Sequence, residues 1–351
     1  MNTRLVASTE HDQPRVNVMN LRLSICIPTY NFGSYIEETL DSIPRIYDDC
    51  IEIVVYDGGS TDQTKDRMLR YARGRTNVRY LRSEKRGGID CDMDIAVRSC
   101  SAPYVWLFSS DDVMQTDSIG LVLKELSSNS DVYLCGLIIC DKQMREIDEH
   151  RFTFVDDLSE FNLGDTSQRL AYFKNAITST ALFSFMSSII VRRSVWVSAR
   201  FQTEFNGSCW AHVALFFSKC DSDLKLKILK TPLLLKRGGN DSFMENGLVN
   251  RISISIDGFT RIAESFFGAE SSEAREVKRV LRNEWPLRYL FHLYTGEGVG
   301  IERTELRRLR QLMQKIYANS GGNLPHLFYF NLKVIPGIFF KLARRFYGTI
   351  C

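Results

Sequence analysis

Acidic residues stand close behind apolar, aromatic-rich segments at two places in the chain. Asp57 follows Val54–Tyr56, and Asp111 and Asp112 follow the run that ends at Phe108. Such runs predict buried strands, so these carboxylates should stand at the carboxyl ends of strands. In an open α/β sheet that edge binds ligands, because helices begin there with unpaired N–H groups. Adjacent aspartates there can hold a divalent cation against a diphosphate. We therefore expect a metal-dependent enzyme that acts on a nucleotide-activated substrate.

Strand and helix patterns alternate along the segments that must position these residues. The expected strands are Leu21–Ile27, Ile51–Tyr56, Val78–Leu81, Tyr104–Phe108 and Val132–Ile139. Helical patterns of about ten residues separate most of them, which is typical of a mostly parallel sheet with right-handed crossovers. The sequence therefore predicts an α/β fold with a mostly parallel central sheet flanked by helices.

The bulk composition excludes several classes of protein. The chain has 351 residues, is 44% hydrophobic and carries a net charge of +3, so it has a substantial core but no strongly basic character. We expect no nucleic-acid partner. Nine scattered cysteines without CxxC pairs are typical of reduced thiols. We find no signal-peptide pattern in Met1–Asn20 and no long apolar span, and we expect a cytoplasmic protein whose membrane contact is peripheral.

The first strand–helix turn separates two kinds of nucleotide enzyme. A dinucleotide oxidoreductase needs a G-x-G-x-x-G turn there, which lets the backbone approach the pyrophosphate. This chain has Pro28–Gly33, with the sequence PTYNFG, and it has no P-loop motif. The sequence therefore argues against both of those classes.

Three motifs in order carry a resemblance to a known family. Ile27–Asn31, Asp57–Thr64 and Ser110–Asp112 resemble the family 2 glycosyltransferases of the GT-A fold. Three further segments are similar to the abequosyltransferase-like branch, which adds dideoxyhexose side branches to lipid-linked O-antigen repeats. These segments are Leu182–Val191, Arg237–Phe243 and Asn283–Pro286.

The resemblance implies a domain organisation. We expect a flexible N-terminus over residues 1–20 and a GT-A catalytic domain over 21–245. Its nucleotide-binding part spans about 21–130 and its acceptor part about 131–245. A helical C-terminal region, 246–351, follows as a candidate for membrane association.

The resemblance also implies roles for residues near the first two strand ends. Pro28, Thr29 and Tyr30 would line the base pocket, with Tyr30 as a stacking face, and Asp57 would accept hydrogen bonds from the base. The alternative for Asp57 is a helix N-cap before Ser60 and Thr61.

A second group of implied roles concerns the diphosphate. Asp111 and Asp112 would hold Mg²⁺ or Mn²⁺, with Ser110 beside them at the donor, and the alternative is an aspartate pair that caps the following helix. Asp90 and Asp92 would contact the nucleotide or donor sugar. Because they are two apart on a helix, we expect one in the site and the other exposed to solvent.

A third group of implied roles lies further along the chain. Arg237, Asn240 and Ser242 would form a polar flap over the diphosphate, and an ordinary surface turn is the alternative.

The catalytic base is the hardest residue to assign. Related enzymes place an acidic residue at the start of a helix in the acceptor half, and here that stretch offers His212 instead. A histidine of near-neutral pKa can remove a hydroxyl proton, but a packed helix histidine is an equal alternative. Glu204 and Asp241 are substitutes. The choice between inversion and retention stays open.

The C-terminal part concerns partners. From Pro325 the chain mixes aromatic and basic residues, as in an interfacial helix on anionic lipid, and a helix pair packed on the core is the alternative. The stretch Arg303–Lys315, with Leu306, Leu309 and Leu312, predicts a core-facing helix.

These observations lead to one expected function and three rivals. The resemblance implies a metal-dependent glycosyltransferase that transfers a (di)deoxyhexose, such as abequose, from a nucleotide-diphosphate sugar to a lipid-linked oligosaccharide in O-antigen or surface polysaccharide synthesis. The expected partners are a nucleotide-diphosphate sugar donor, a lipid-linked oligosaccharide acceptor and the inner membrane surface. One rival is a family 2 transferase that uses a common UDP- or GDP-hexose. The others are a non-catalytic member that binds nucleotide or glycan, and a membrane-bound scaffold.

Overall fold

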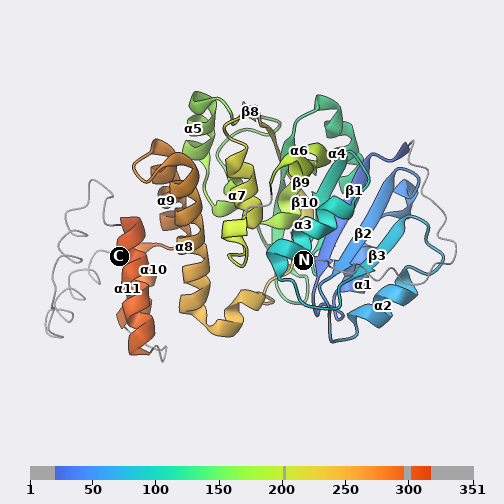
Figure 1. The fold of residues 1–351 in the computed structure, drawn as a ribbon, viewed down its shortest axis with the longest axis horizontal. Helices are drawn as coiled ribbons and strands as arrows, with labels where there is room; N and C mark the ends of the chain where they lie inside the picture. Colours follow the sequence, from blue (N-terminus) through green and yellow to red (C-terminus); the bar gives the residue numbers. More distant parts are fainter. Residues whose placement is uncertain (1–19, 201–202, 296–301, 318–351) are drawn as a thin grey trace, which may run out of the picture. The chain divides into compact units, whose positions relative to one another are not determined.

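Four parallel strands form the half of the sheet that carries the predicted nucleotide site. In the computed structural model, which describes residues 20–200, 203–295 and 302–317, they lie in the order β3–β2–β1–β4 (Figure 1). Their bounds are β1 Leu23–Thr29, β2 Ile51–Asp57, β3 Val78–Arg82 and β4 Tyr104–Leu107. All three pairings are parallel, as predicted. Pro28 lies inside β1, so our expectation that the first strand ends at Ile27 is wrong.

A second group of strands turns the sheet into a mixed one. In the described part of the chain it has ten strands, and β9 joins its two halves by running antiparallel to both β4 and β6. β10 then lies parallel to β6 and antiparallel to β5. The bounds are β5 Val113–Met114, β6 Val132–Cys140, β7 Glu146–Glu149, β8 Glu160–Asn162, β9 Ile189–Arg192 and β10 Lys225–Lys236.

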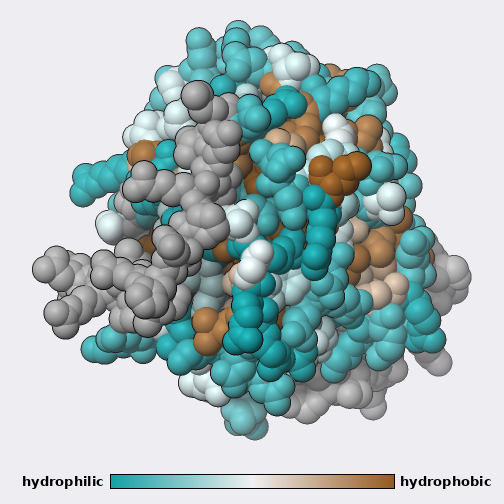
Figure 2. Space-filling view, turned by 90° about the vertical axis from the view of Figure 1, so that its right-hand side faces the viewer, coloured by the Kyte–Doolittle hydropathy of each residue, from teal (hydrophilic) through white to brown (hydrophobic). Residues whose placement is uncertain are grey.

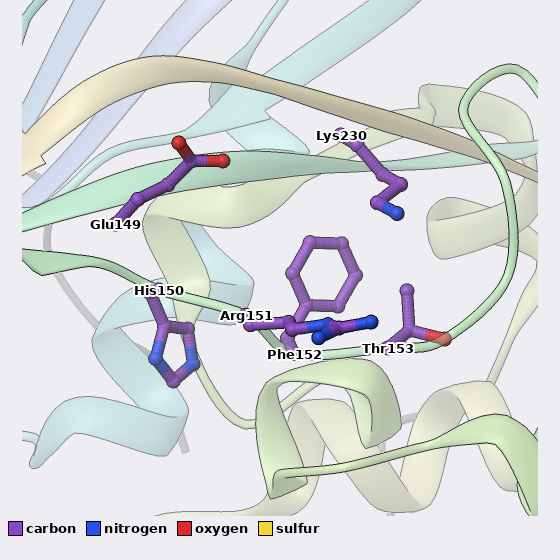
Figure 3. A pocket seen from close by; sticks show the side chains of 6 residues that line it. All are labelled: Glu149, His150, Arg151, Phe152, Thr153 and Lys230. Atoms are coloured by element: carbon purple, nitrogen blue, oxygen red, sulfur yellow. The ribbon is translucent and has the colours of Figure 1, made fainter.

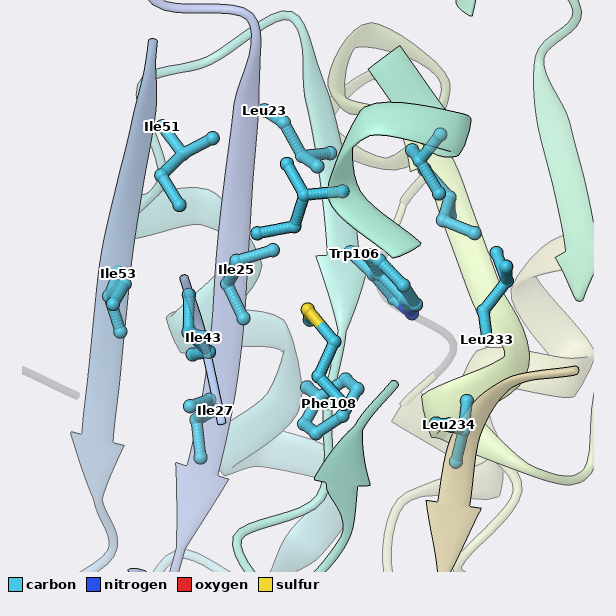
Figure 4. Close-up of a cluster of buried hydrophobic side chains, with 14 of the residues drawn as sticks. Leu23, Ile25, Ile27, Ile43, Ile51, Ile53, Trp106, Phe108, Leu233 and Leu234 are labelled. Atoms are coloured by element: carbon cyan, nitrogen blue, oxygen red, sulfur yellow. The ribbon is translucent and has the colours of Figure 1, made fainter. Parts of the chain in front are cut away.

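The core lies against the central strands. β1 and β2 are buried along their whole length, which is why they read as near-continuous apolar runs. Ile25, Ile53 and Trp106 pack in one cluster with Leu233 from β10 (Figure 4). The core therefore joins both halves of the sheet and fixes the strand ends that follow it.

Helices and short 3₁₀ turns connect and flank these strands. The α-helices of the first compact unit are α1 Ile36–Asp41, α2 Thr64–Tyr71, α3 Ile89–Ser99, α4 Ser118–Glu125, α5 Thr166–Asn175, α6 Arg193–Ser198, α7 Ala211–Ser218, α8 Leu248–Phe267 and α9 Ser272–Glu284. The 3₁₀ turns are η2 Arg45–Tyr47, η3 Leu126–Ser128, η4 Ser179–Leu182, η5 Met186–Ser188, η6 Thr203–Phe205 and η7 Ser242–Asn246.

The first compact unit ends at Glu284, and a second begins at Trp285. The expected domain boundary near residue 245 falls inside the first unit, because α8 contacts α7 while α9 contacts α5 and η4. The second unit contains α10 (Leu287–Thr295) and α11 (Arg303–Tyr317), which contact each other. Leu309 and Leu312 of α11 are buried, as predicted.

Several expectations fall at the margins of the described chain. The N-terminus up to residue 19 and the segment from Pro325 lie outside the described residues. Within the described part, no helix is long and apolar enough to cross a membrane.

The eight described cysteines are free thiols. On the face shown in Figure 2, hydrophilic residues dominate and hydrophobic ones form small, separate groups.

Candidate active site

The carboxyl ends of β1 and β2 bring Thr29 and Asp57 side by side. They are partners in the strand register, and the Gly58 N–H donates to the Thr29 carbonyl at 2.9 Å. Asp57 is fully buried, and its carboxylate accepts bonds from the Ser60 N–H at 2.7 Å and the Tyr80 hydroxyl at 2.6 Å. These bonds fix the orientation of Asp57 at the strand end.

Asp57 does not cap α2, so the helix-cap alternative is wrong. That helix begins at Thr64, and Asp62 accepts the Thr64 N–H at 2.9 Å. Asp57 closes the turn before it instead. Its negative charge is balanced by the Arg82 side chain, whose Nε lies 3.3 Å from Oδ2.

Asp92 of α3 points to the same edge, and two glycines make room for its carboxylate. A Cβ atom on Gly58 would stand 2.2 Å from Asp92 Oδ2, and one on Gly87 would stand 2.6 Å from Oδ1. Burial and the charge of Asp57 raise the pKa of Asp92 to about 7, although Arg86 opposes this rise. Asp92 therefore keeps its proton to a higher pH than an exposed aspartate does.

Two buried polar atoms at this edge lack partners. Among the described residues, neither Thr29 Oγ1 nor Asp92 Oδ1 has a hydrogen bond. Most buried polar atoms in folded proteins are paired, so each unpaired one calls for an explanation. A ligand with hydrogen-bonding edges, such as a nucleobase, would complete both atoms.

Tyr30 lies next along the chain and is partly covered. The Arg86 guanidinium sits 4.3 Å from its ring centroid. A base that stacks on Tyr30 must use the opposite face or displace Arg86. Pro28 contributes to this edge only through its place in β1, where it pairs in register with Tyr56.

Asp90 has a different environment from Asp92. Its carboxylate accepts the N–H groups of Gly207 at 2.8 Å, Cys209 at 3.0 Å and Ala211 at 3.0 Å. It therefore holds the loop that leads into α7. Asp90 and Asp92 are both buried, so our expectation that one of them is exposed is wrong.

Asp111 and Asp112 stand together beyond the end of β4, and both carboxylates accept hydrogen bonds from neighbouring residues. Asp111 accepts bonds from the Ser109 hydroxyl and from Asn240 Nδ2, the latter at 2.8 Å. Asp112 accepts the Ser187 hydroxyl at 2.6 Å and the Arg237 N–H at 3.1 Å. The next helix, α4, begins only at Ser118, so the pair does not cap it.

The environment of this pair fits a divalent cation. Ser110, Asp111 and Asp112 are all buried. Desolvation and the neighbouring charge of Asp111 raise the pKa of Asp112 to about 7. No cluster of three or more metal-binding side chains occurs in the described residues. Two carboxylates nevertheless suit a cation whose other ligands are water and substrate phosphate, and a cation would relieve their repulsion.

Arg237 joins this pair to the first helix. Its side chain donates to the Asp111 carbonyl at 3.0 Å and to the Glu38 carboxylate at 2.6 Å, and its guanidinium covers Tyr35 at 4.9 Å. With these bonds the guanidinium stabilises the turn that carries the two aspartates. Asn240 also bonds the pair, as given above, but Ser242 is exposed at the start of η7, next to the cap residue Asp241.

His212 lies in the interior. Its Nε2 is 2.9 Å from the Phe183 carbonyl, and Nδ1 has no partner among the described residues. Burial lowers the pKa of His212, while the charge of Asp90 opposes this change. The imidazole is therefore neutral and its Nε2–H donates to the Phe183 carbonyl. This arrangement favours the alternative in which His212 is a packed helix histidine. The substitutes Glu204 and Asp241 are exposed, and Asp241 pairs with Arg251 at 2.7 Å.

Sequence reasoning did not single out two residues that the structure brings to this region. Ser187 donates to Asp112, and Glu284 at the end of α9 accepts bonds from Ser179 of η4, the turn that precedes Ser187. Both fall inside segments that carried the narrower resemblance, which was the available signal.

A cavity of ≈310 Å³ lies elsewhere. Glu149–Thr153 line one side, and Lys230 of β10 reaches in from the other (Figure 3). None of the predicted site residues lines it.

Comparisons with known proteins assign the chain to a family. Residues 24–192 match the model of Glycosyl transferase family 2. Abequosyltransferase RfbV from Salmonella typhimurium is 31% identical over 307 residues, which are 86% of this chain and 90% of that protein. A chondroitin synthase from Escherichia coli is 33% identical over 103 residues, 29% of this chain and 15% of that protein. The chain belongs to glycosyl transferase family 2.

The fold is also found in solved structures. S. aureus TarS 1-349 in complex with UDP-GlcNAc has a TM-score of 0.57 and 17% identity, with 84% of this chain and 82% of that chain covered. At this identity the likeness concerns the fold alone. The protein is thus a glycosyltransferase with a GT-A-type fold and C-terminal helices.

Proposed function

We propose that this enzyme transfers a deoxyhexose or dideoxyhexose, such as abequose, from a nucleotide-diphosphate sugar to a lipid-linked oligosaccharide during surface polysaccharide synthesis. The likeness to abequosyltransferase RfbV over 90% of that protein supports the sugar class. The observation that carries the chemistry is the buried pair Asp111 and Asp112 at the ligand-binding edge of the sheet.

Each part of the edge has a task in this proposal. Thr29 and Asp92 supply the unpaired atoms that bind the base, and Tyr30 lies beside them. Asp57 fixes the turn that follows β2. Asp111 and Asp112 would hold Mg²⁺ or Mn²⁺ near the diphosphate. When bound, the cation stabilises the charge of the departing nucleoside diphosphate. Asn240 and Arg237 keep the two carboxylates in place.

The acceptor side of the proposal requires contact with a membrane. We place the enzyme in the cytoplasm at the inner face of the cytoplasmic membrane. Exposed Arg303, Arg307 and Arg308 on α11 support this, because such side chains suit anionic lipid headgroups. Co-sedimentation with anionic vesicles, and none with neutral vesicles, is the expected result.

A thermal-shift screen tests the donor. The purified protein is melted with CDP, UDP, GDP or dTDP, with and without Mn²⁺, because a ligand that binds only the native state raises the melting temperature. We expect a Mn²⁺-dependent shift with one nucleotide, and CDP would favour the abequosyltransferase-like reading. A shift with UDP or GDP alone would favour a transferase of common hexoses. No shift with any of them would contradict the proposal.

Matched variants locate the effect. Asp111→Asn and Asp112→Asn should lose the Mn²⁺-dependent part of the shift. Asp117→Asn is the control, because Asp117 is exposed in the same connection and adopts the left-handed backbone that asparagine accepts. It should behave as the wild type does.

A further inference from the structure

Glu284, the last residue of α9, faces the turn η4. Its Oε1 accepts the Ser179 N–H at 2.7 Å and the Ser179 hydroxyl at 2.7 Å. The Ser184 hydroxyl lies 2.9 Å from that of Ser179. Among the described residues, Oε2 of Glu284 has no hydrogen-bond partner. One oxygen is thus held in position and the other is available.

The segment that holds Glu284 also holds the aspartate pair. Ser179 lies at its start, and Ser187, eight positions on, donates to Asp112 at 2.6 Å. Between them, the Phe185 ring lies 5.0 Å from the Lys236 ammonium. Lys236 immediately precedes Arg237, whose N–H donates to Asp112. The segment from Ser179 to Ser187 therefore connects Glu284 with Asp112, and the Lys236–Arg237 segment contacts it at Phe185 and bonds the same aspartate.

Electrostatics agrees with this placement. The Lys236 side chain, which contacts Phe185 of the same segment, is a positive charge that acts on Glu284. Burial raises the pKa of Glu284, and the Ser179 bonds, Arg251 of α8 and Lys236 of β10 oppose that rise. A carboxylate whose pKa is raised toward the working pH is suited to proton transfer.

The other acidic groups that could serve as the base are engaged or exposed. Asp90 serves three backbone N–H groups, as described above. Asp241 pairs with Arg251, and Glu204 lies on the surface. Glu284 therefore combines a fixed orientation, a free oxygen and a connection to the aspartate pair.

We propose that Glu284 is the general base that takes the proton from the acceptor hydroxyl, an inference that rests on the proposed function. The hydroxyl oxygen forms a bond to the anomeric carbon of the donor, and its proton passes to Oε2. The bond between the anomeric carbon and the diphosphate oxygen breaks, and the nucleoside diphosphate leaves with the electron pair. Ser179 positions the carboxylate.

Azide separates proton removal from departure of the leaving group. Release of nucleoside diphosphate is measured for CDP-, UDP-, GDP- and dTDP-linked hexoses and deoxyhexoses, with water as the acceptor and then with sodium azide. Glu284→Gln and Glu284→Ala should lower the release by about 10²–10⁴-fold, the usual range for general base catalysis. Azide is already an anion and needs no base, so it should restore release by Glu284→Ala.

The matched variants give the opposite pattern. Asp111→Asn should stay inactive with azide, because departure of the diphosphate is impaired. Glu270→Gln, in the exposed loop before α9, should keep full activity. The hydroxyl bond from Ser179 lowers the pKa of Glu284, so its loss in Ser179→Ala should raise that pKa. The acidic limb of the pH–rate profile should therefore move to higher pH. A merely structural role of Ser179 would leave that limb in place.

Three outcomes would overturn the inference. Full release by Glu284→Ala without azide would do so, as would a loss that azide does not restore in a variant that keeps its nucleotide-induced thermal shift. A wild type that releases no nucleotide from any of these donors and shows no thermal shift contradicts the proposed function and this inference with it.

Discussion

The carboxylate of Asp92 fills the space beside Gly58 that any larger residue would occupy with its side chain. The separation of 2.2 Å between Asp92 Oδ2 and a Cβ at position 58 is far below van der Waals contact. The glycine directly after Asp57 is therefore needed by a residue of α3 and not by the turn alone.

This contact predicts the effect of Gly58→Ala. The extra methyl group must displace Asp92, so we expect a loss of about 1–3 kcal/mol in the free energy of unfolding. The nucleotide-induced thermal shift should fall as well. Urea denaturation of Gly58→Ala, Asp92→Ala and the double variant measures the coupling. If the two changes were additive, the contact would not be the cause.

The raised pKa of Asp92 predicts a stability that depends on pH. The native state binds this proton more tightly than the unfolded chain, whose ordinary value is 3.8, so stability falls as pH rises from about 4 to about 7. Asp92→Asn lacks this ionisation. Its free energy of unfolding relative to the wild type should therefore rise over that interval and level off above it. Denaturation without nucleotide at several pH values checks this, and a constant difference would contradict it.

Removal of divalent metal should reproduce the loss of the aspartate pair. With EDTA, nucleotide release by the wild type should fall to the level of Asp112→Asn, because in the proposed function the same carboxylates hold the cation. The residual activity of Asp112→Asn should not respond to EDTA. Added Mn²⁺ should restore the wild type and the Asp117→Asn control. A wild type indifferent to EDTA would exclude the metal role.

Asp90→Ala should separate structure from donor binding. Three N–H groups lose a charged acceptor, so we expect destabilisation of about 3 kcal/mol or more. The nucleotide-induced thermal shift should survive, because the carboxylate faces the loop before α7. Thermal melting with and without the nucleotide measures both effects. Loss of the shift in a folded variant would instead support the donor-contact role that the resemblance implied.

Local pattern was sufficient for some of these residues and not for others. The strand end at Asp57 and the turn after β4 that carries Asp111 follow from apolar runs of the right length, so their place at one sheet edge could be predicted. The task of Asp90 depends on Gly207 and Ala211, more than a hundred positions away, and no spacing reveals such partners. His212 illustrates the same limit, because its burial and its bond to Phe183 arise only from packing. Glu284 lies at a helix end whose neighbour, Ser179, is equally remote.

The position of β10 has a consequence for how the enzyme is made. Its residues Leu234 and Leu235 pair with Met114 and Val113, directly behind Asp112. The turn that carries the aspartates is therefore completed by a strand that leaves the ribosome long afterwards. Such distant pairing is slow to form, because loop-closure entropy must be overcome first. We therefore expect a nascent chain that stops before residue 237 to contain both aspartates without the strand that pairs behind them, and to bind no sugar nucleotide until β10 is made.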